Sequence, residues 1–380
     1  MDFSRILQNN LSEYLKKYGK QSPESHLRAI RDILLCRTPE LGGEVYLCPE
    51  CAELHYSYHS CKNRHCPKCG RNDSAKWLEK QLAKLLPVKY FMVTFTIPRE
   101  LHKICLPNQK LLYDIQFKAS SEALKILLSD PKYAGGVSGF TGVLHTWTRQ
   151  LEYHPHIHYI VPGGAWNKER KSWQKTGNKF LIPVKALSVI YRAKFRDLLR
   201  LENQQLFERI SPLVWQQKEF VTHSQPVGKG QEALTYLANY VYRTAITNNR
   251  ILCEKDGLVT FKYKPADSAK FAFKSVESVE FINKFLMHVL PQGFQKIRYY
   301  GFLSPAAKSV WEMVSSFFPA KSGSHDKNQT AKTFVIPKFE KDLCPNCQAK
   351  MTLHASITGK PRSPPWSLLF LANCFDGGKL

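Results

Sequence analysis

Residues 139–162 read GFTGVLHTWTRQLEYHPHIHYIVP, and β-branched and aromatic residues dominate on both sides of a short polar segment. This composition predicts two strands, at 139–149 and 154–162, which are joined tightly enough to form a hairpin. If the chain turns near Gln150 and Leu151, the two strands pair symmetrically about that point. We therefore expect an antiparallel sheet that contains this hairpin.

Histidines gather on one face of the predicted hairpin. His156 and His158 alternate along the second strand, so both imidazoles project from one face while Ile157 points to the opposite, buried side. Symmetrical pairing places His145 opposite His156 on the same face, and His154 near the turn has the same parity. Converging imidazoles predict a divalent metal site, although histidines are also often half-buried for packing or hydrogen bonding. The expected ion is Mg²⁺ or Mn²⁺, because imidazole ligands favour manganese while cellular abundance and phosphate oxygens favour magnesium.

The pattern of apolar residues predicts an α+β protein around the hairpin. Further strands are expected at 89–98, where the run KYFMVTFTIP ends at a proline, and at 259–264. Helices are expected where apolar residues recur at helical spacing, namely at 1–35, 75–86, 99–128 with an interruption near Pro107, 185–209, 231–247 and 275–290. A polar stretch from Ala320 to Thr333 is the best candidate for a linker. The predicted domain divisions are 1–86, 87–320 and 321–380.

The composition indicates a polyanion as the partner. Lysine and arginine number 55 against 31 acidic residues among 380, a formal charge of +24, while 43% of the residues are hydrophobic. Such a chain folds, and its basic excess suits nucleic acid. The apolar stretch from Trp366 to Phe375 is too short to cross a bilayer, and the N-terminus lacks the apolar core of a signal peptide. We therefore expect neither secretion nor a membrane partner.

Cysteines form close pairs in the N-terminal region. Of eleven cysteines, six lie between Cys36 and Cys69, and no export signal favours disulfides. Two C-x2-C pairs can supply four thiolates from tight turns, which predicts a tetrahedral Zn²⁺ site. The predicted ligands are Cys48, Cys51, Cys66 and Cys69. Buried free cysteines are the alternative, and Cys36, Cys61 and His65 leave room for a second ion or for a different choice of ligands.

The segment YLANYVYRTAITNNR at 236–250 carries two tyrosines at helical spacing. Tyr236 and Tyr240 are four residues apart, so both lie on one face of the predicted helix. A tyrosine hydroxyl, with a pKa of about 10, can still displace an alkoxide from phosphorus when a metal ion neutralises the phosphate. We infer that these tyrosines attack DNA, and aromatic residues in a core stripe are the alternative.

Basic and aromatic residues suggest where single-stranded DNA binds. The segment 160–200 is strongly basic and contains two tryptophans, which can stack on unpaired bases while lysine and arginine contact phosphates. Structural tryptophans and a solvated basic surface are the alternatives. The predicted DNA-binding residues are Trp166, Trp173, Lys62, Arg64, Arg243, Asn248 and Arg250.

Several separate strings resemble one group of transposases. They are SCKNRHCPKC at 60–69, FTIPREL at 95–101, LHTW followed by HPHIHYIVPGG at 154–164, the tyrosine segment at 236–250, and HVLPQGFQKIRYYGFL at 288–303. Through these strings most of the chain resembles the rolling-circle transposases of the HUH superfamily. The specific resemblance is to the two-tyrosine insertion-sequence group (IS-ninety-one-like).

The resemblance implies a metal-dependent DNA transposase. It implies an antiparallel sheet with helices on one face, metal-binding histidines at His156 and His158, and nucleophilic tyrosines at Tyr236 and Tyr240 on a helix laid across the sheet. It also implies that an N-terminal zinc-binding domain precedes the endonuclease domain. The implied reaction cleaves and rejoins single-stranded DNA at transposon ends and target through a 5′-phosphotyrosine intermediate. Its implied setting is the nucleoid in the prokaryotic cytoplasm, where host replication proteins could take part.

A C-terminal C-P-N-C, with Cys344 and Cys347, also fits the family. It supplies only half of a zinc site, because zinc needs four ligands. Cys374 and His354 could complete it, and a degenerate remnant of a site is the alternative.

Two other functions are compatible with portions of the sequence. A rolling-circle replication initiator or relaxase shares the histidines and tyrosines, but the cysteine block and the string HVLPQGF argue against it. A non-catalytic, zinc-dependent DNA-binding protein would keep its tyrosines in a core. The sequence has no G-x4-G-K-[ST] loop, so no ATPase activity is expected.

Overall fold

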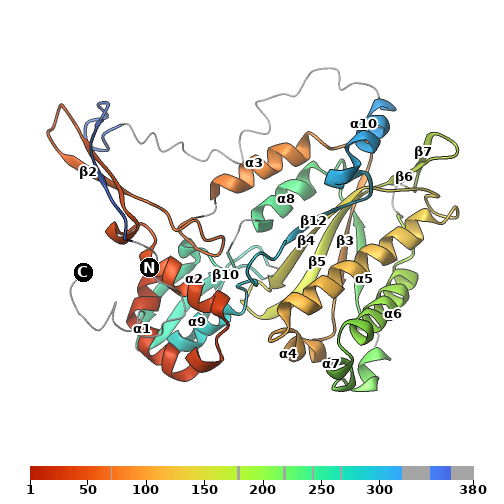
Figure 1. The fold of residues 1–380 in the computed structure, drawn as a ribbon, viewed down its shortest axis with the longest axis horizontal. Coiled ribbons are helices and arrows are strands. Elements are labelled where there is room, and N and C mark those ends of the chain that lie inside the picture. Colours follow the sequence, from red (N-terminus) through yellow and green to blue (C-terminus); the bar gives the residue numbers. More distant parts are fainter. Residues whose placement is uncertain are drawn as a thin grey trace.

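A five-stranded antiparallel sheet organises the largest portion of the molecule (Figure 1). The computed structural model describes residues 1–69, 71–177, 180–216, 220–241, 244–265, 268–318 and 343–360. The strands run in the order β12-β4-β5-β3-β8, and every neighbouring pair is antiparallel. Their bounds are Tyr90–Thr96 for β3, Phe140–Trp147 for β4, Tyr153–Pro162 for β5, Thr222–Pro226 for β8 and Ile297–Tyr300 for β12. The predicted α+β class and antiparallel sheet are confirmed.

The hairpin of β4 and β5 has the predicted register at its centre. His145 lies opposite His156, as symmetrical pairing about the turn requires. A bulge after His145 shifts the next pair, so that Trp147 lies opposite Tyr153. Leu151 turns the chain with a φ of 63°. The bulge therefore affects only the end of the hairpin next to the turn.

Helices α5 (Gln109–Ser129) and α6 (Val184–Glu202) cover one face of the sheet. Alternate strand residues point into this layer, and Phe95 and Ile157 are both 0% exposed there. Because strand side chains alternate between faces, His158 and the other residues of its parity point to the opposite face.

The opposite face carries α3 (Arg71–Leu82) and α8 (Gln231–Val241). Leu237 of α8 is 0% exposed and belongs to one buried cluster with Val143 of β4 and Ile160 of β5. The helix that carries the predicted tyrosines therefore lies over the face of the sheet to which the histidines point. Helices cover both faces of this sheet, not only the one face that the resemblance implied. It ends at Val241 within the described residues, earlier than the predicted span of 231–247.

The N-terminal helices α1 (Phe3–Tyr18) and α2 (Glu24–Leu35) pack against α9 (Ser278–Leu286). The ring centroids of Phe3 and Phe285 are 4.0 Å apart. Beside these helices lies a second antiparallel sheet, formed by β9 (Ile251–Lys255), β10 (Leu258–Tyr263) and β11 (Ala272–Glu277). All these elements contribute to one buried cluster. The N-terminal domain predicted for residues 1–86 therefore shares its core with residues from the second half of the chain.

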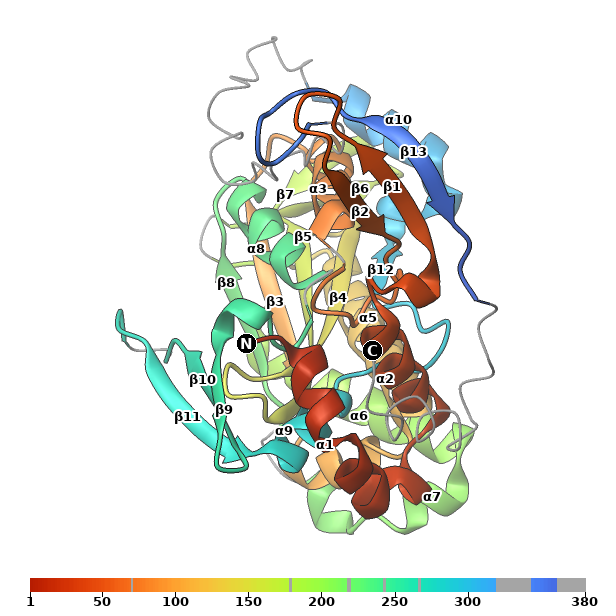
Figure 2. The same cartoon turned by 90° about the vertical axis from the view of Figure 1, so that its left-hand side faces the viewer.

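A small three-stranded sheet joins segments from near the two ends of the chain (Figure 2). Strands β1 (Gly43–Leu47) and β2 (Leu54–Tyr58) form a hairpin, and β13 (Thr352–Ile357) pairs with the other side of β1. We call residues 43–58 and 343–360 the ribbon, which stands away from the rest of the fold (Figure 1). A segment of the predicted C-terminal tail is therefore a strand bound to an N-terminal hairpin.

Short elements complete the described fold. They are α4 (His102–Cys105), β6 (Gly164–Asn167), β7 (Ser172–Lys175), α7 (Gln204–Glu208) and α10 (Lys308–Ser316). The helix predicted at 275–290 begins only at Ser278, because the residues before it pair with β10. The predicted linker from Ala320 to Thr333 lies outside the described residues. Among the helices of the described segments, none combines the length and apolar character that a bilayer span needs.

Candidate active site and cysteine clusters

Three histidines meet on the face of the sheet that lies under α8. His156 and His158 come from β5 and His145 from β4, and their ligand nitrogens lie within 4.8 Å of one another. The ring centroids of His145 and His158 are 4.7 Å apart, and those of His156 and His158 are 4.8 Å apart. The structure thus brings together the three side chains that the hairpin register predicted to be neighbours. His154, which has the same parity as His156 and was a further candidate ligand, is not in this group.

Hydrogen bonds engage Nδ1 of His156 and of His158, and this leaves Nε2 as the nitrogen that can face a metal ion. Nδ1 of His156 lies 2.7 Å from the carbonyl oxygen of His154, and because a carbonyl only accepts, this nitrogen carries the proton. Nδ1 of His158 is 2.8 Å from Oγ1 of Thr94 on β3. A threonine hydroxyl can accept from Nδ1–H of His158, and in that tautomer both rings keep Nε2 for a ligand, which is how hydrogen bonds orient histidines in metal sites.

Burial keeps the three imidazoles neutral. Desolvation lowers the pKa of His158 to about 4. It also lowers the pKa of His145 and of His156 well below the usual value, and the neighbouring histidines strengthen the shift. Neutral imidazole is the form that ligates a divalent metal ion, so this donor set fits such an ion.

Tyr236 lies beside the histidines. Its ring centroid is 6.4 Å from that of His158, with the two rings nearly perpendicular. The residue is 40% exposed, so its side chain is accessible from solvent. Tyr240 lies one turn further along α8, and its side chain is outside the described portion of the structure. Arg243, which was predicted to contact DNA, also lies outside the described residues.

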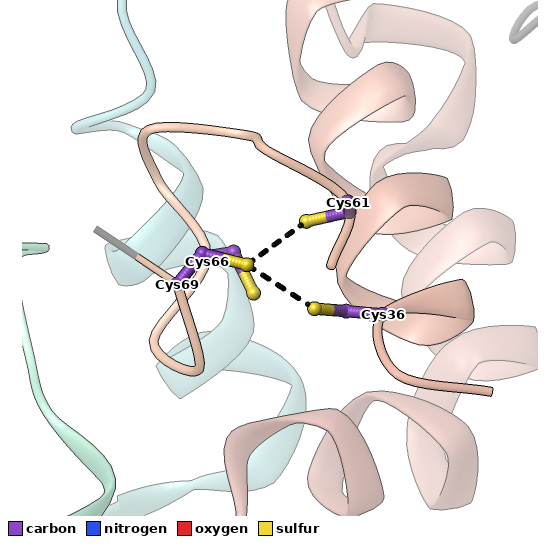
Figure 3. Close-up of side chains that lie close together, drawn as sticks. All are labelled: Cys36, Cys61, Cys66 and Cys69. Atoms are coloured by element: carbon purple, nitrogen blue, oxygen red, sulfur yellow. Dashed lines mark hydrogen bonds between the residues drawn. The ribbon is translucent and has the colours of Figure 1, made fainter. Parts of the chain in front are cut away.

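Eight of the described cysteines form two clusters of four, whereas the sequence predicted one cluster of four. The first cluster consists of Cys36, Cys61, Cys66 and Cys69, whose sulfurs lie within 4.8 Å of one another (Figure 3). Cys36 ends α2, and the other three come from the loop that precedes α3. Sγ of Cys69 is 3.3 Å from Sγ of Cys36 and 3.6 Å from Sγ of Cys61. This cluster belongs to the core that α1, α2 and α9 share.

The second cluster lies on the ribbon. It consists of Cys48 and Cys51, between β1 and β2, together with Cys344 and Cys347, ahead of β13. The structure thereby corrects the predicted ligand set, because Cys48 and Cys51 lie on a different substructure from Cys66 and Cys69. The N-terminal hairpin provides the two cysteines that group with the C-terminal pair Cys344 and Cys347. His354 is not in this group, and Cys374 lies outside the described residues.

His65 and Arg64 hold the cysteine loop to a distant segment. Nε2 of His65 accepts a hydrogen bond from the backbone N–H of Leu290 at 3.2 Å, and His65 joins neither cysteine cluster. Desolvation lowers the pKa of His65 well below its usual value. The guanidinium of Arg64 donates to the carbonyl oxygens of Phe294 at 2.7 Å and Pro291 at 3.2 Å. Both side chains therefore have structural partners. His65 is not a member of either described cysteine cluster, and the contact of the exposed Arg64 with DNA stays a prediction.

The two tryptophans predicted to stack on DNA bases pack against the region of α10. Trp166 is 1% exposed, and its ring centroid is 4.4 Å from that of Phe317. Trp173 is half-buried, with its centroid 5.5 Å from that of Phe318. Trp166 therefore has no free ring face for a base. Lys62 is exposed, and its contact with DNA stays a prediction.

Asn248 and Arg250 connect distant segments of the fold. The side chain of Asn248 accepts from the backbone N–H of Phe3 at 3.2 Å and donates to the carboxylate of Asp2 at 2.9 Å. These bonds fasten the start of α1. The guanidinium of Arg250 donates to backbone carbonyl oxygens, among them that of Lys262 at 2.9 Å. Both residues therefore have structural roles, and since both are only half-buried, their contacts with DNA stay predictions.

Two residues near the histidines were not singled out in the sequence. Thr94 lies opposite His158 in the pairing of β3 with β5, which only the register of two distant strands reveals. Lys296 is half-buried with Nζ 4.8 Å from the ring centroid of Trp147, and desolvation lowers its pKa to about 7. It lies just ahead of β12, and no local pattern marks it.

Two regions of the chain match families of known proteins. Residues 139–310 match the family described as "Putative transposase", and residues 6–97 match the one described as "Transposase zinc-binding domain". The first region contains the three histidines and α8. The second contains the first cysteine cluster, whereas Cys344 and Cys347 lie outside both regions.

Two known proteins align with most of this chain. "Putative transposase y4qJ" from Sinorhizobium fredii is 36% identical over 321 residues, which cover 77% of this chain and 80% of the relative. "Transposase for insertion sequence element IS801" from Pseudomonas savastanoi pv. phaseolicola is 24% identical over 357 residues, which cover 88% of this chain and 84% of the relative. No solved structure gives a significant match.

Proposed function

This chain belongs to the rolling-circle transposases of the two-tyrosine, IS91-like insertion-sequence group, and from this membership we propose that it cleaves and rejoins single-stranded DNA. The proposed reaction is metal-dependent and passes through a 5′-phosphotyrosine intermediate, as in the HUH superfamily. Its substrates are the single strands at transposon ends and at the target.

One observation carries this proposal. Tyr236 is solvent-accessible and lies next to His158, at the point where three neutral imidazoles converge. A tyrosine that served only as core packing would be buried, as Tyr159 is at 0% on the other face of the same sheet. The exposed phenol beside candidate metal ligands is what a nucleophilic tyrosine requires.

The chemistry follows from this arrangement. The phenol oxygen of Tyr236 attacks the phosphorus of a phosphodiester as the bond to the 3′ oxygen breaks. The phenol loses its proton, the leaving 3′ oxygen gains one, and the products are a 5′-phosphotyrosine and a free 3′ hydroxyl. The new ester conserves the energy of the broken bond, so a 3′ hydroxyl can reverse the reaction on the same or another strand.

The three histidines would hold the metal ion that this reaction needs. A divalent ion, Mg²⁺ or Mn²⁺, would supply charge neutralisation at the phosphate. Thr94 and the carbonyl of His154 hold the imidazoles with Nε2 available, so the ligands are oriented before an ion arrives.

Tyr240 is proposed as the second nucleophile. It follows Tyr236 by four residues on the same helix, so the two lie on one side of α8. With two tyrosines, one can hold the donor 5′ end while the other cleaves or joins at a second site. Neither covalent link then has to dissociate during the transfer.

The first cysteine cluster is proposed to bind Zn²⁺ through Cys36, Cys61, Cys66 and Cys69. Its four sulfurs lie within 4.8 Å of one another, and the matched zinc-binding domain contains all four residues. Such a site stabilises the loop that carries Lys62 and leads into α3.

The proposed setting is the prokaryotic nucleoid, where host replication proteins could join the reaction. A formal charge of +24 favours binding to DNA, and the affinity should fall steeply with rising salt.

A covalent-adduct assay tests the proposed reaction. Full-length protein is incubated with single-stranded terminal DNA and Mg²⁺ or Mn²⁺, boiled in detergent, and the DNA-bearing peptide is mapped by mass spectrometry. We expect an adduct on the peptide of α8, weaker or redirected adducts in Tyr236→Phe and Tyr240→Phe, and none in the double variant. Tyr56→Phe is the matched control, because Tyr56 is 56% exposed but lies on the ribbon.

Two results would contradict the proposal. An adduct that persists in the double variant would place the nucleophile elsewhere. Absence of any adduct with the wild-type protein, despite binding to the same DNA, would indicate a non-catalytic DNA-binding protein. If both single variants formed normal adducts, the two tyrosines would be interchangeable and the assigned division of labour would be wrong.

A further inference from the structure

The two C-x2-C turns of the ribbon have the same backbone conformation, although nearly the whole chain separates them. In the first turn the N–H of Cys48 donates to the carbonyl of Glu53 at 3.0 Å, and in the second the N–H of Cys344 donates to the carbonyl of Ala349 at 2.8 Å. The correspondence means that each half of the cluster is a complete metal-binding turn.

A second pair of hydrogen bonds and a pair of backbone angles extend the correspondence. The N–H of Ala52 donates to the carbonyl of Cys48 at 2.9 Å, and the N–H of Gln348 donates to the carbonyl of Cys344 at the same distance. Ala52 and Gln348 occupy the same place in the two turns and both have positive φ, 57° and 62°. A non-glycine residue in this region costs energy, so its occurrence at both equivalent positions argues for a shared function.

The sulfur positions fit a tetrahedral ion. Sγ of Cys48 is 3.3 Å from Sγ of Cys347, and Sγ of Cys51 is 3.7 Å from Sγ of Cys344. Sγ of Cys347 and Sγ of Cys51 are 3.9 Å apart. A tetrahedral zinc ion with Zn–S bonds of about 2.3 Å places its sulfurs about 3.8 Å from one another. All four cysteines are free, so no disulfide accounts for their approach.

The ribbon has too little apolar core to hold its strands together. Among the described residues, its buried cluster consists of Cys48, Cys344 and Met351, with Tyr46 and Ala349 packed against it, and Val45 is buried as well. Leu54, Tyr56 and Leu353 are exposed by 44%, 56% and 60%. Small sheets without a substantial core need a metal or another cross-link for stability.

We propose that Cys48, Cys51, Cys344 and Cys347 bind one Zn²⁺ ion that fastens the C-terminal strand β13 to the N-terminal hairpin. Each thiol gives up its proton to become a thiolate ligand, and four thiolates in a closed tetrahedral set select zinc in a structural role. The protein then carries one zinc ion in each cysteine cluster. This site is separate from the histidine cluster and does not depend on the proposed cleavage reaction.

Metal content tests the proposal directly. Full-length protein is produced with zinc under reducing conditions, and zinc per chain is measured by elemental analysis and by native mass spectrometry. We expect two ions in the wild type and one in the variant Cys344→Ser/Cys347→Ser. Cys253→Ser is the control and should keep two ions, because Cys253 is exposed and belongs to neither cluster.

Two further measurements separate metal loss from general misfolding. Cys347→His should keep the second ion, because three cysteines and one histidine also form a structural zinc site. Backbone amide exchange should show that residues 352–357 lose protection in the double serine variant, while β5 keeps its protection.

A wild-type protein that held no more zinc per chain than the double serine variant would overturn the proposal. It would also fail if the double serine variant still held two ions, or if 352–357 stayed protected without the second ion. A disulfide among these four cysteines in protein prepared under reducing conditions would contradict the proposal as well. None of these measurements involves DNA cleavage, so their failure is distinguishable from failure of the proposed cleavage reaction.

Discussion

The histidine cluster and the ribbon cysteine cluster both gather metal-binding side chains, but they differ in what surrounds them. The histidines lie on a five-stranded sheet that has helices on both faces, and Thr94 and the carbonyl of His154 hold two of the rings. The ribbon has three short strands and a buried cluster of three side chains. The fold therefore builds the first site, whereas the ion must help to build the second.

This difference indicates how much of the free energy of metal binding each site spends on ordering the chain. At a site that the fold has already formed, little of that energy is spent on ordering the chain, and it remains available to stabilise charge at a reacting phosphate. At the ribbon, binding and folding are coupled, so most of the energy goes into structure. Loss of a histidine should therefore impair chemistry without unfolding, and loss of a cysteine should unfold the ribbon.

The largest expected effect is that of His156→Ala on DNA cleavage. Charge stabilisation by a metal ion contributes several kcal/mol, and each step of about 1.4 kcal/mol changes a rate tenfold. We expect adduct formation to fall by about 1000-fold or more, with an unchanged circular dichroism spectrum and an unchanged zinc content.

The control for this variant is His354→Ala, which removes an exposed histidine from β13. It should cleave at the wild-type rate. If His156→Ala also cleaved normally, or if it lost zinc, the contrast between the two sites would be wrong.

A smaller effect is expected for Thr94→Val, which removes the hydroxyl 2.8 Å from Nδ1 of His158 but leaves every proposed ligand in place. Loss of such an orienting hydrogen bond typically costs about 10- to 100-fold in metal affinity or activity. The Mn²⁺ concentration that gives half-maximal cleavage should rise by that factor. Thr96→Val on the same strand is the matched control, because its hydroxyl donates to the carbonyl of Val221 instead.

An equal metal requirement in Thr94→Val and Thr96→Val would show that the histidine rings are held in place without Thr94. The histidine site would then depend less on its surroundings than we infer.

The smallest effect is expected for Met351→Ala in the ribbon. Met351 is 9% exposed and belongs to the small buried cluster there, so its truncation should cost about 1 kcal/mol of ribbon stability. Because zinc binding and ribbon folding are coupled, the zinc affinity of this site should fall about fivefold in a competition titration with a chelator.

Leu353→Ala is the control for this measurement, because Leu353 lies two residues further along, on β13, and is 60% exposed. It should leave the affinity unchanged. An equal loss in both variants would mean that burial in the ribbon core does not contribute to metal binding.

The histidine site was largely predictable because it depends on a local hairpin. The turn near Leu151 sets the register, and the register brings His145 to His156. Thr94 was not predictable in the same way. Its place next to His158 depends on the pairing of β3 with β5, two strands that are far apart in sequence.

The grouping of cysteines was harder, because spacing along the chain suggested that the two nearest C-x2-C pairs share an ion. In the structure Cys48 and Cys51 bend away on the ribbon, while Cys66 and Cys69 meet Cys36 at the end of α2. Spacing identified the residue types that bind zinc but not the partners.

The predicted DNA contacts show why composition alone is a weak guide to exposure. A basic segment pointed to Trp166, yet β6 turns this ring into the layer under α10. Asn248 looked like a polar residue at a helix end, but it fastens the start of α1 through Asp2 and Phe3. Which side of an element is buried depends on what packs against it.

Local order along the chain was thus enough for the α+β class, the hairpin with its histidines, the helix with its paired tyrosines, and the turns that bind zinc. These features depend on backbone preferences and contacts over a few residues, which a reader of the sequence can evaluate. Packing between distant segments decided the meeting of Tyr236 with His158, the sharing of cysteines between the two ends of the chain, and the burial of Trp166. These contacts are stabilised by burial of surfaces that meet only after long stretches of chain have been brought together. No local sequence pattern therefore reveals which residues make them.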